Sequence, residues 1–241
     1  MNIASELLKL RSLPTPKMIA AVCLGLTALV TLIVVVTSPS DPEVYREGPR
    51  GTATVATMIG ALVFGAWMFG LDFAQGTLRR TLATEPRRWV VLANKGLVTV
   101  LATAGFSAVS AAFGAALSQW ISSSRSIGLA WGDSLNLIPS LVIQATLVAL
   151  IASAVTLFFR SFVGGLVAAF ALLFVVDGVL GIWEAIRDYT ISVALADIDI
   201  TFANNSAEPT NGFAPALLIV FAWIAAIAVP GVIRFLRADF K

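Results

Sequence analysis

The sequence predicts an all-α integral membrane protein in which six transmembrane helices form a single domain over residues 1–241. The first observation is composition: 58% of the residues are hydrophobic and 12% are charged, whereas soluble domains contain about 25% charged residues. The second is a mean hydropathy of +0.90. The third is a series of apolar runs close to the roughly 20 residues that a helix needs to cross a bilayer.

The distribution of basic residues predicts the orientation. An even number of crossings places both chain ends on one side of the membrane. The basic residues on that side are Lys9, Arg11, Lys17, Arg79, Arg80, Arg87, Arg88, Lys95, Arg160, Arg234, Arg237 and Lys241. Those on the other side are Arg46, Arg50, Arg125 and Arg187. Because cytoplasmic loops are enriched in Lys and Arg, both termini are predicted to be cytoplasmic.

The single cysteine and the lack of histidine exclude several kinds of site. Cys23 is the only cysteine, so no disulfide forms within the chain. The sequence contains no histidine, which excludes Ser-His hydrolysis and the His-Glu-x-x-His zinc site. We expect neither a catalytic residue nor a metal site.

The first element is an amphipathic elbow helix over about residues 2–13. Apolar Leu7 lies between charged Glu6 and Lys9 at helical spacing, which is typical of a helix that lies along the membrane surface. A mobile basic tail is the alternative. Pro14 marks the end of this element.

The transmembrane helices follow in order. They are predicted at residues 17–37, 53–72, 87–118, 136–159, 162–182 and 213–236. A cleaved signal peptide is the rival interpretation of the first, but this run is longer than the 7 to 15 apolar residues of such a signal. We therefore expect a retained helix.

The segment 183–212, between the fifth and sixth spans, is long for a bare loop and mixes apolar with acidic residues. Such connections usually have structure or a function, so we expect short external helices. Asp177, the one carboxylate inside a predicted span, is a candidate functional residue by default. Its place near the outer end of that span favours a simpler role, in which it contacts water or caps the outer segment.

The loop between the second and third spans is the most informative stretch, and it reads LDFAQGTLRRTLATEPRRW over residues 71–89. Asp72 and Gln75 resemble a capping box, which predicts a short helix over residues 73–84 across the inner ends of both spans. Thr77 could instead cap a shorter helix. The simpler interpretation of the arginines is that they mark the cytoplasmic side and pair with lipid phosphates.

The motif in this loop resembles that of a known family. An acidic residue that closes the second span, then Gly-Thr-Leu-Arg-Arg-x-Leu, then Pro-Arg-Arg and a Lys at the start of the third span, resembles the type-2 permease family of ATP-binding-cassette (ABC) exporters. The six-span outline with an elbow is similar to the same family. Asp72 is a departure, because family members commonly have Glu at this place.

The resemblance implies a coupling helix that contacts a separate ATPase. It implies two copies of an ABC ATP-binding subunit, a second permease chain, identical or homologous, and a place in the lipid bilayer of the bacterial cytoplasmic membrane, without nucleic acid. ATP and Mg²⁺ would bind the partner subunit, and this chain would bind no cofactor. The residues implied in the ATPase contact are Gly76, Thr77, Leu78, Arg79, Arg80, Thr81 and Leu82.

The chain lacks the G-x-x-x-x-G-K-[ST] loop that cradles nucleotide phosphates, so we expect no ATPase activity from it alone. The hypothesis is a permease subunit that exports an amphiphilic or hydrophobic molecule, such as a drug, a peptide antibiotic or a lipid-linked compound. The alternatives are a membrane-embedded enzyme that acts on a lipid and a non-transporting anchor or sensor subunit.

Aromatic residues on two spans could line the path of an amphiphile, although ordinary packing is the alternative use of such residues. The absence of charge along these spans argues against a path for small ions. The candidates are Phe64, Trp67, Met68, Phe69, Phe170 and Phe174.

Overall fold

The computed structural model describes Leu8 and residues 12–37, 42–77, 87–124, 131–202 and 208–237. Every regular element in these ranges is helical, and six helices are long and apolar enough to cross a membrane. This confirms the predicted all-α class, with six helices as candidate membrane spans. The elements are α2 (Pro14–Thr37), α3 (Pro42–Ala74), α5 (Arg88–Ser124), α6 (Trp131–Leu135), α7 (Leu137–Phe159), α8 (Phe162–Ala171), η1 (Leu172–Val176), α9 (Asp177–Leu180), α10 (Glu184–Arg187), α11 (Ile191–Phe202) and α12 (Phe213–Arg237).

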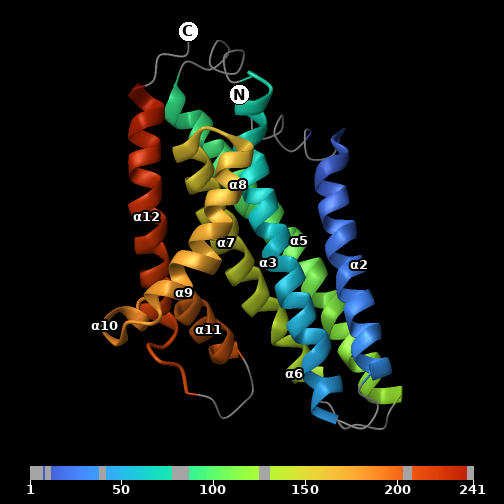
Figure 1. Ribbon diagram of the computed structural model, residues 1–241. Helices are drawn as coiled ribbons and strands as arrows, with labels where there is room; N and C mark the ends of the chain where they lie inside the picture. The colour runs from blue at the N-terminus through green and yellow to red at the C-terminus, as the bar shows by residue number, and fades with distance from the viewer. Residues whose placement is uncertain are drawn as a thin grey trace.

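The long helices run along one another, and α2 begins at the same end of the bundle at which α12 finishes (Figure 1). We call this the basic end, because Lys17, Arg87, Arg88, Arg160, Arg234 and Arg237 lie there. The short helices α6, α10 and α11 lie toward the opposite end.

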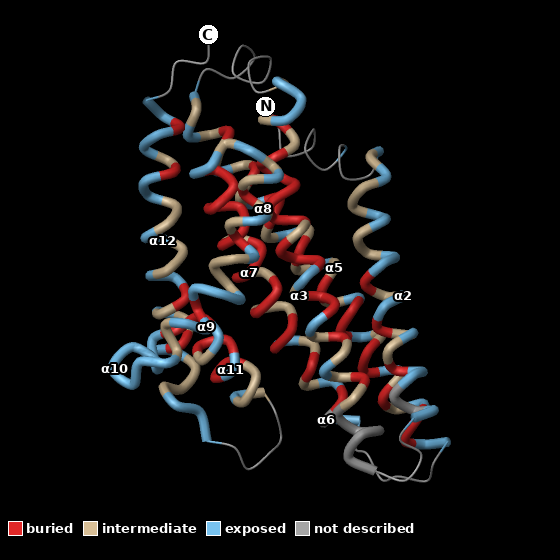
Figure 2. Tube along the Cα trace, in the orientation of Figure 1, coloured by how far each residue is buried: buried red, intermediate tan, exposed pale blue. Residues whose placement is uncertain are grey.

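Helix α7 lies at the centre of the bundle. In its most apolar stretch 72% of the residues are buried, against 67% in α3 and only 17% in α2 and α12. The buried residues gather on α3, α5 and α7 (Figure 2). Because lipid is as apolar as the core, the outer helices can keep large exposed apolar side chains in a membrane.

Several helices extend beyond their predicted bounds. Helix α3 begins at Pro42 rather than at residue 53, and α5 continues to Ser124 rather than 118. The apolar run marks the part of a helix that crosses lipid, whereas hydrogen bonding continues the helix into polar sequence. The fifth span is composite, because the π-helical turn η1 separates α8 from α9.

Two predicted helices fall largely outside the described residues. Of the elbow at residues 2–13, only Leu8, Ser12 and Leu13 are described, and the first two are helical. Of the coupling helix at residues 73–84, the part from 78 onward lies outside. Residues 73 and 74 belong to α3, and residues 75–77 form a turn. The predicted start of the coupling helix is therefore wrong, because α3 continues through it.

The crossing of α3 and α7 is very close at Gly65. A Cβ atom built on Gly65 would lie 2.2 Å from the carbonyl oxygen of Ala149. Ser153 Oγ donates a hydrogen bond to the carbonyl oxygen of Gly65 at 3.0 Å. The two backbones touch at this point because residue 65 has no side chain.

Candidate functional site

A buried ion pair joins α3 to α5 near the basic end. Lys95 Nζ lies 2.6 Å from Asp72 Oδ2, and the two side chains are 4% and 5% exposed. The same ammonium donates to the carbonyl oxygen of Met68 at 3.0 Å and lies 5.7 Å from the ring centroid of Phe69. A charge pair this dry is stable only when both partners are present and well bonded. The pair therefore fixes the last turns of α3 against the first turns of α5.

The end of α3 is closed by a left-handed glycine. Gln75 N–H donates to the carbonyl oxygen of Leu71 at 2.9 Å, and Gly76 follows with φ of 62°, a conformation that costs glycine little. Thr77 Oγ1 then donates to Asp72 Oδ1 at 2.9 Å. Asp72 thus ties the outgoing chain back to α3.

This arrangement corrects the predicted capping box. Asp72 and Gln75 were expected to begin a new helix, but Asp72 lies inside the last turn of α3. Its carboxylate is bonded to the side chains of Lys95 and Thr77. The sequence motif contained Lys95 but did not identify it as the partner of Asp72. An acid near the end of one span and a base near the start of the next are the signal for such a pair.

Arginines at the basic end bond to the carboxyl ends of neighbouring helices. Arg88 Nη1 donates to the carbonyl oxygens of Leu236 at 2.8 Å and Phe235 at 3.3 Å. Arg160 donates to the carbonyl oxygen of Arg234. Cations stabilise helix carboxyl ends, where carbonyl groups lack partners within the helix. The sequence predicted only that Arg88 pairs with lipid phosphates. In the structure it joins α5 to α12.

Four of the predicted path residues lie in a buried cluster. Phe64, Trp67, Met68 and Phe69 are buried, and they pack in one cluster with core residues that include Phe235. In this conformation the four side chains pack against one another and their neighbours, and the path along them stays a prediction. The spacing of aromatic residues along a helix does not distinguish side chains that pack in the core from side chains that line a transport path.

The other two path residues lie on the surface. Phe170 and Phe174 stack with ring centroids 4.4 Å apart, and both are exposed. Phe174 also lines a cavity of about 230 Å³ with Met58 and Leu62 of α3 and Leu195 of α11. These two residues stay candidates for contact with an apolar ligand.

Asp177 caps the start of α11, at the end of the bundle opposite the basic end. Its Oδ1 accepts a hydrogen bond from the N–H of Ile191 at 2.6 Å, and its Oδ2 accepts one from Ser192 at 3.0 Å. The residue is 2% exposed. A carboxylate on the first N–H groups of a helix satisfies donors that have no partner within the helix. The expectation that Asp177 caps the outer segment is confirmed.

Two further aspartates that the sequence did not single out, Asp197 and Asp199, hold the same segment. Asp197 accepts hydrogen bonds from the N–H groups of Thr210 at 2.7 Å and Asn211 at 2.9 Å, just before α12. Asp199 Oδ1 lies 3.2 Å from Arg50 Nη2 and accepts from Ser140 Oγ at 2.6 Å. Positions two apart face different sides of a helix, so each carboxylate serves a different neighbour. The pair D-x-D within an apolar helix is the sequence signal.

We expect Asp177→Ala to lower the free energy of unfolding by about 1–3 kcal/mol, because the N–H groups of Ile191 and Ser192 at the start of α11 would lose their acceptor. Thermal unfolding in detergent, followed by circular dichroism, measures the change. Asp188→Ala is the matched control, since the exposed side chain of Asp188 lies on the same outer segment. Equal melting temperatures for the two variants would contradict the capping role.

No protein-family profile matches this chain, and neither does a curated protein or a solved structure.

Proposed function

We propose that this chain is the permease subunit of an ATP-driven ABC transporter in a bacterial cytoplasmic membrane. The basic end faces the cytoplasm, where two copies of a separate ATPase bind. A second permease chain completes the transport path. The cargo is an amphiphilic or hydrophobic molecule, which the transporter exports by alternating access.

The observation that carries the proposal is the buried pair of Asp72 and Lys95. These are the acid that closes the second span and the Lys of the third span in the motif that resembles the type-2 exporters. The pair clamps α3 to α5 at 2.6 Å, and the segment 78–86 connects these two helices. A force applied to that segment would reach both helices together, as coupling to a motor requires.

Hydrophobic cargo is supported by the exposed Phe170 and Phe174, whose rings stack on the outer face of the fifth span. The alternative of a membrane-embedded enzyme loses support, because its candidate acid, Asp177, is bonded to two backbone N–H groups. A non-transporting sensor would differ from a permease in one measurable respect: the ATPase rate of its complex would not respond to any transported compound.

Purification of the tagged chain from its native membrane tests the proposal. We expect an ATPase with a P-loop to copurify with it. We also expect Leu78→Asp to abolish that copurification, because an acid would replace an apolar contact at the ATPase surface. Circular dichroism of the purified variant should be unchanged.

Leu135→Asp is the matched control for Leu78→Asp. Leu135 is exposed on α6 at the opposite end of the bundle, so its replacement should leave the ATPase bound. Absence of any P-loop ATPase from the native complex would overturn the proposal. Normal ATPase binding and transport in Leu78→Asp would move the contact away from this loop.

A further inference from the structure

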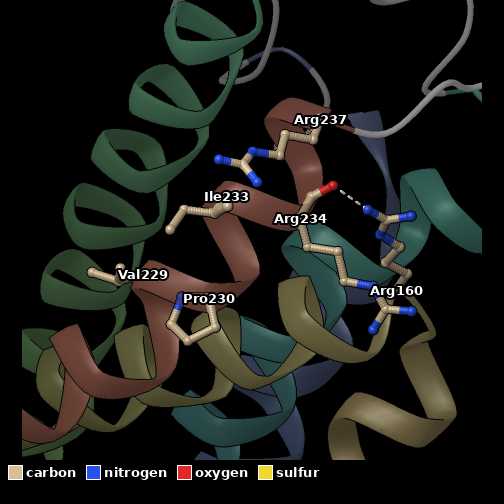
Figure 3. A pocket seen from close by; sticks show the side chains of 6 residues that line it. All are labelled: Arg160, Val229, Pro230, Ile233, Arg234 and Arg237. Atoms are coloured by element: carbon tan, nitrogen blue, oxygen red, sulfur yellow. Dashed lines mark hydrogen bonds between the residues drawn. The ribbon is translucent and has the colours of Figure 1, made fainter.

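Two cavities meet beside the basic end of α12. The first, the arginine groove, has a volume of about 640 Å³ and lies at the last turns of α12 (Figure 3). The second, the apolar groove, has a volume of about 420 Å³ and lies between α7, α8, η1 and α12. Pro230 lines both, so the two grooves adjoin at this residue. The arginine groove is lined by Arg160, Val229, Pro230, Ile233, Arg234 and Arg237.

The apolar groove has the chemistry of a hydrocarbon site. Its walls include Phe158 of α7, Leu172 of η1 and Ile227 of α12, and every lining residue is apolar. Ten residues of α12 separate Ile227 from Arg237, which corresponds to about 15 Å of helix. This is half of the roughly 30 Å hydrocarbon thickness of a bilayer. The two grooves together therefore match the depth of one leaflet.

The arginine groove concentrates positive charge at the end of this path. Arg234 and Arg237 are exposed, lie about a turn apart on α12 and both line the arginine groove. Arg160 reaches the carbonyl group of Arg234 from the turn between α7 and α8 (Figure 3). Desolvation, and then the nearby charge of Arg234, lower the pKa of Arg160. An anion at this place would relieve the repulsion between the two guanidinium groups.

The hydrogen bond of Arg234 to a helix carbonyl uses only part of its guanidinium group. Arg234 Nη1 donates to the carbonyl oxygen of Phe158 at 3.3 Å, but a guanidinium group has five N–H donors in a planar fork. Such a fork binds phosphate oxygens in pairs. Arg234 can therefore hold the end of α7 and a phosphate group at the same time.

We propose that an anionic phospholipid binds in these two grooves, with its phosphate at Arg234 and Arg237 and one acyl chain between α7, α8 and α12. The site is independent of the transport function proposed above. It is a fixed lipid position, because its apolar part is a groove bounded by four elements rather than a convex helix surface.

Native mass spectrometry of the full-length chain in detergent tests the site. The probes are phosphatidylglycerol and phosphatidylcholine with identical acyl chains, and glycerol phosphate without chains. A basic residue near an anionic lipid contributes about a fivefold change in affinity. We expect wild-type protein to bind phosphatidylglycerol at least about fivefold more tightly than phosphatidylcholine, and glycerol phosphate not to displace it.

Two variants separate the parts of the site. The double variant Arg234→Gln, Arg237→Gln should remove most of this preference for phosphatidylglycerol, so that the two lipids bind almost equally. Ala226→Phe, which fills the apolar groove, should weaken both lipids several-fold and leave their ratio unchanged. The matched controls are Arg187→Gln, at the opposite end, and Ala225→Phe, an exposed position of α12 outside the lining. Neither control should alter binding.

A purely structural role of the arginines predicts a different result, in which the double variant melts at a lower temperature but keeps the wild-type ratio between the two lipids. That result would overturn the proposal. Equal affinity of wild-type protein for the two lipids would also overturn it. Displacement by glycerol phosphate would show a site for soluble anions and would equally contradict a lipid site.

Discussion

Lys95→Met should lower the free energy of unfolding by about 3–5 kcal/mol, because it leaves the carboxylate of Asp72 buried without its counter-charge. The distance of 2.6 Å and the exposure of only 4% and 5% place this pair among dry ion pairs. Water cannot replace the lost ammonium at such a site. Unfolding by heat or by a denaturing detergent, followed by circular dichroism, measures the change.

A double variant separates the ion pair from the packing of its side chains. Asp72→Asn together with Lys95→Met removes both charges and keeps similar volumes, so most of the lost stability should return. The two single variants would then be less stable than the double one. If Lys95→Met and the double variant unfold at the same temperature or detergent concentration, the charge of Asp72 is not buried as described.

Gly65→Ala should lower the free energy of unfolding by about 1–3 kcal/mol, because the added methyl group forces α3 away from α7. Its Cβ atom would lie 2.2 Å from the carbonyl oxygen of Ala149 and 2.8 Å from the Cα atom of the same residue. Neither atom belongs to a flexible side chain that could turn aside. The helices must separate, and the hydrogen bond from Ser153 to residue 65 must lengthen.

Gly105→Ala is the matched control for this change. Gly105 lies in α5, and a Cβ atom there would meet nothing within 4 Å. Because alanine is the better helix former, this variant should be as stable as the wild type or more stable by up to about 1 kcal/mol. Equal melting temperatures for Gly65→Ala and Gly105→Ala would contradict the close crossing of α3 and α7.

The positions of the spans could be predicted because hydropathy is a property of neighbouring residues. The predicted span 136–159 differs from α7 (Leu137–Phe159) by one residue at its start. The predicted bounds were wrong where a helix is longer than its apolar run. Helix α3 begins in the polar sequence at Pro42, and at its other end it continues through Asp72 to Ala74.

The candidate site was predictable only in part. The motif directed attention to the end of the second span, and the outer position of Asp177 indicated a cap. The partner of each carboxylate was not predictable, since Lys95 is 23 residues from Asp72, and the backbone N–H groups of Ile191 and Ser192 carry no side-chain signature. The burial of Phe64 and Trp67 likewise depends on which helices pack against α3.

The sequence by itself determined that this chain is helical with six candidate membrane spans, and that most of its basic residues fall at one end of those spans. Both are sums over local composition, to which distant residues contribute nothing. Only the tertiary structure decided which polar groups meet: Asp72 with Lys95, Asp177 with the start of α11, and Arg160 with the end of α12. In a medium without water each buried polar group must bond to another part of the chain, and the packing of the helices determines where that partner lies.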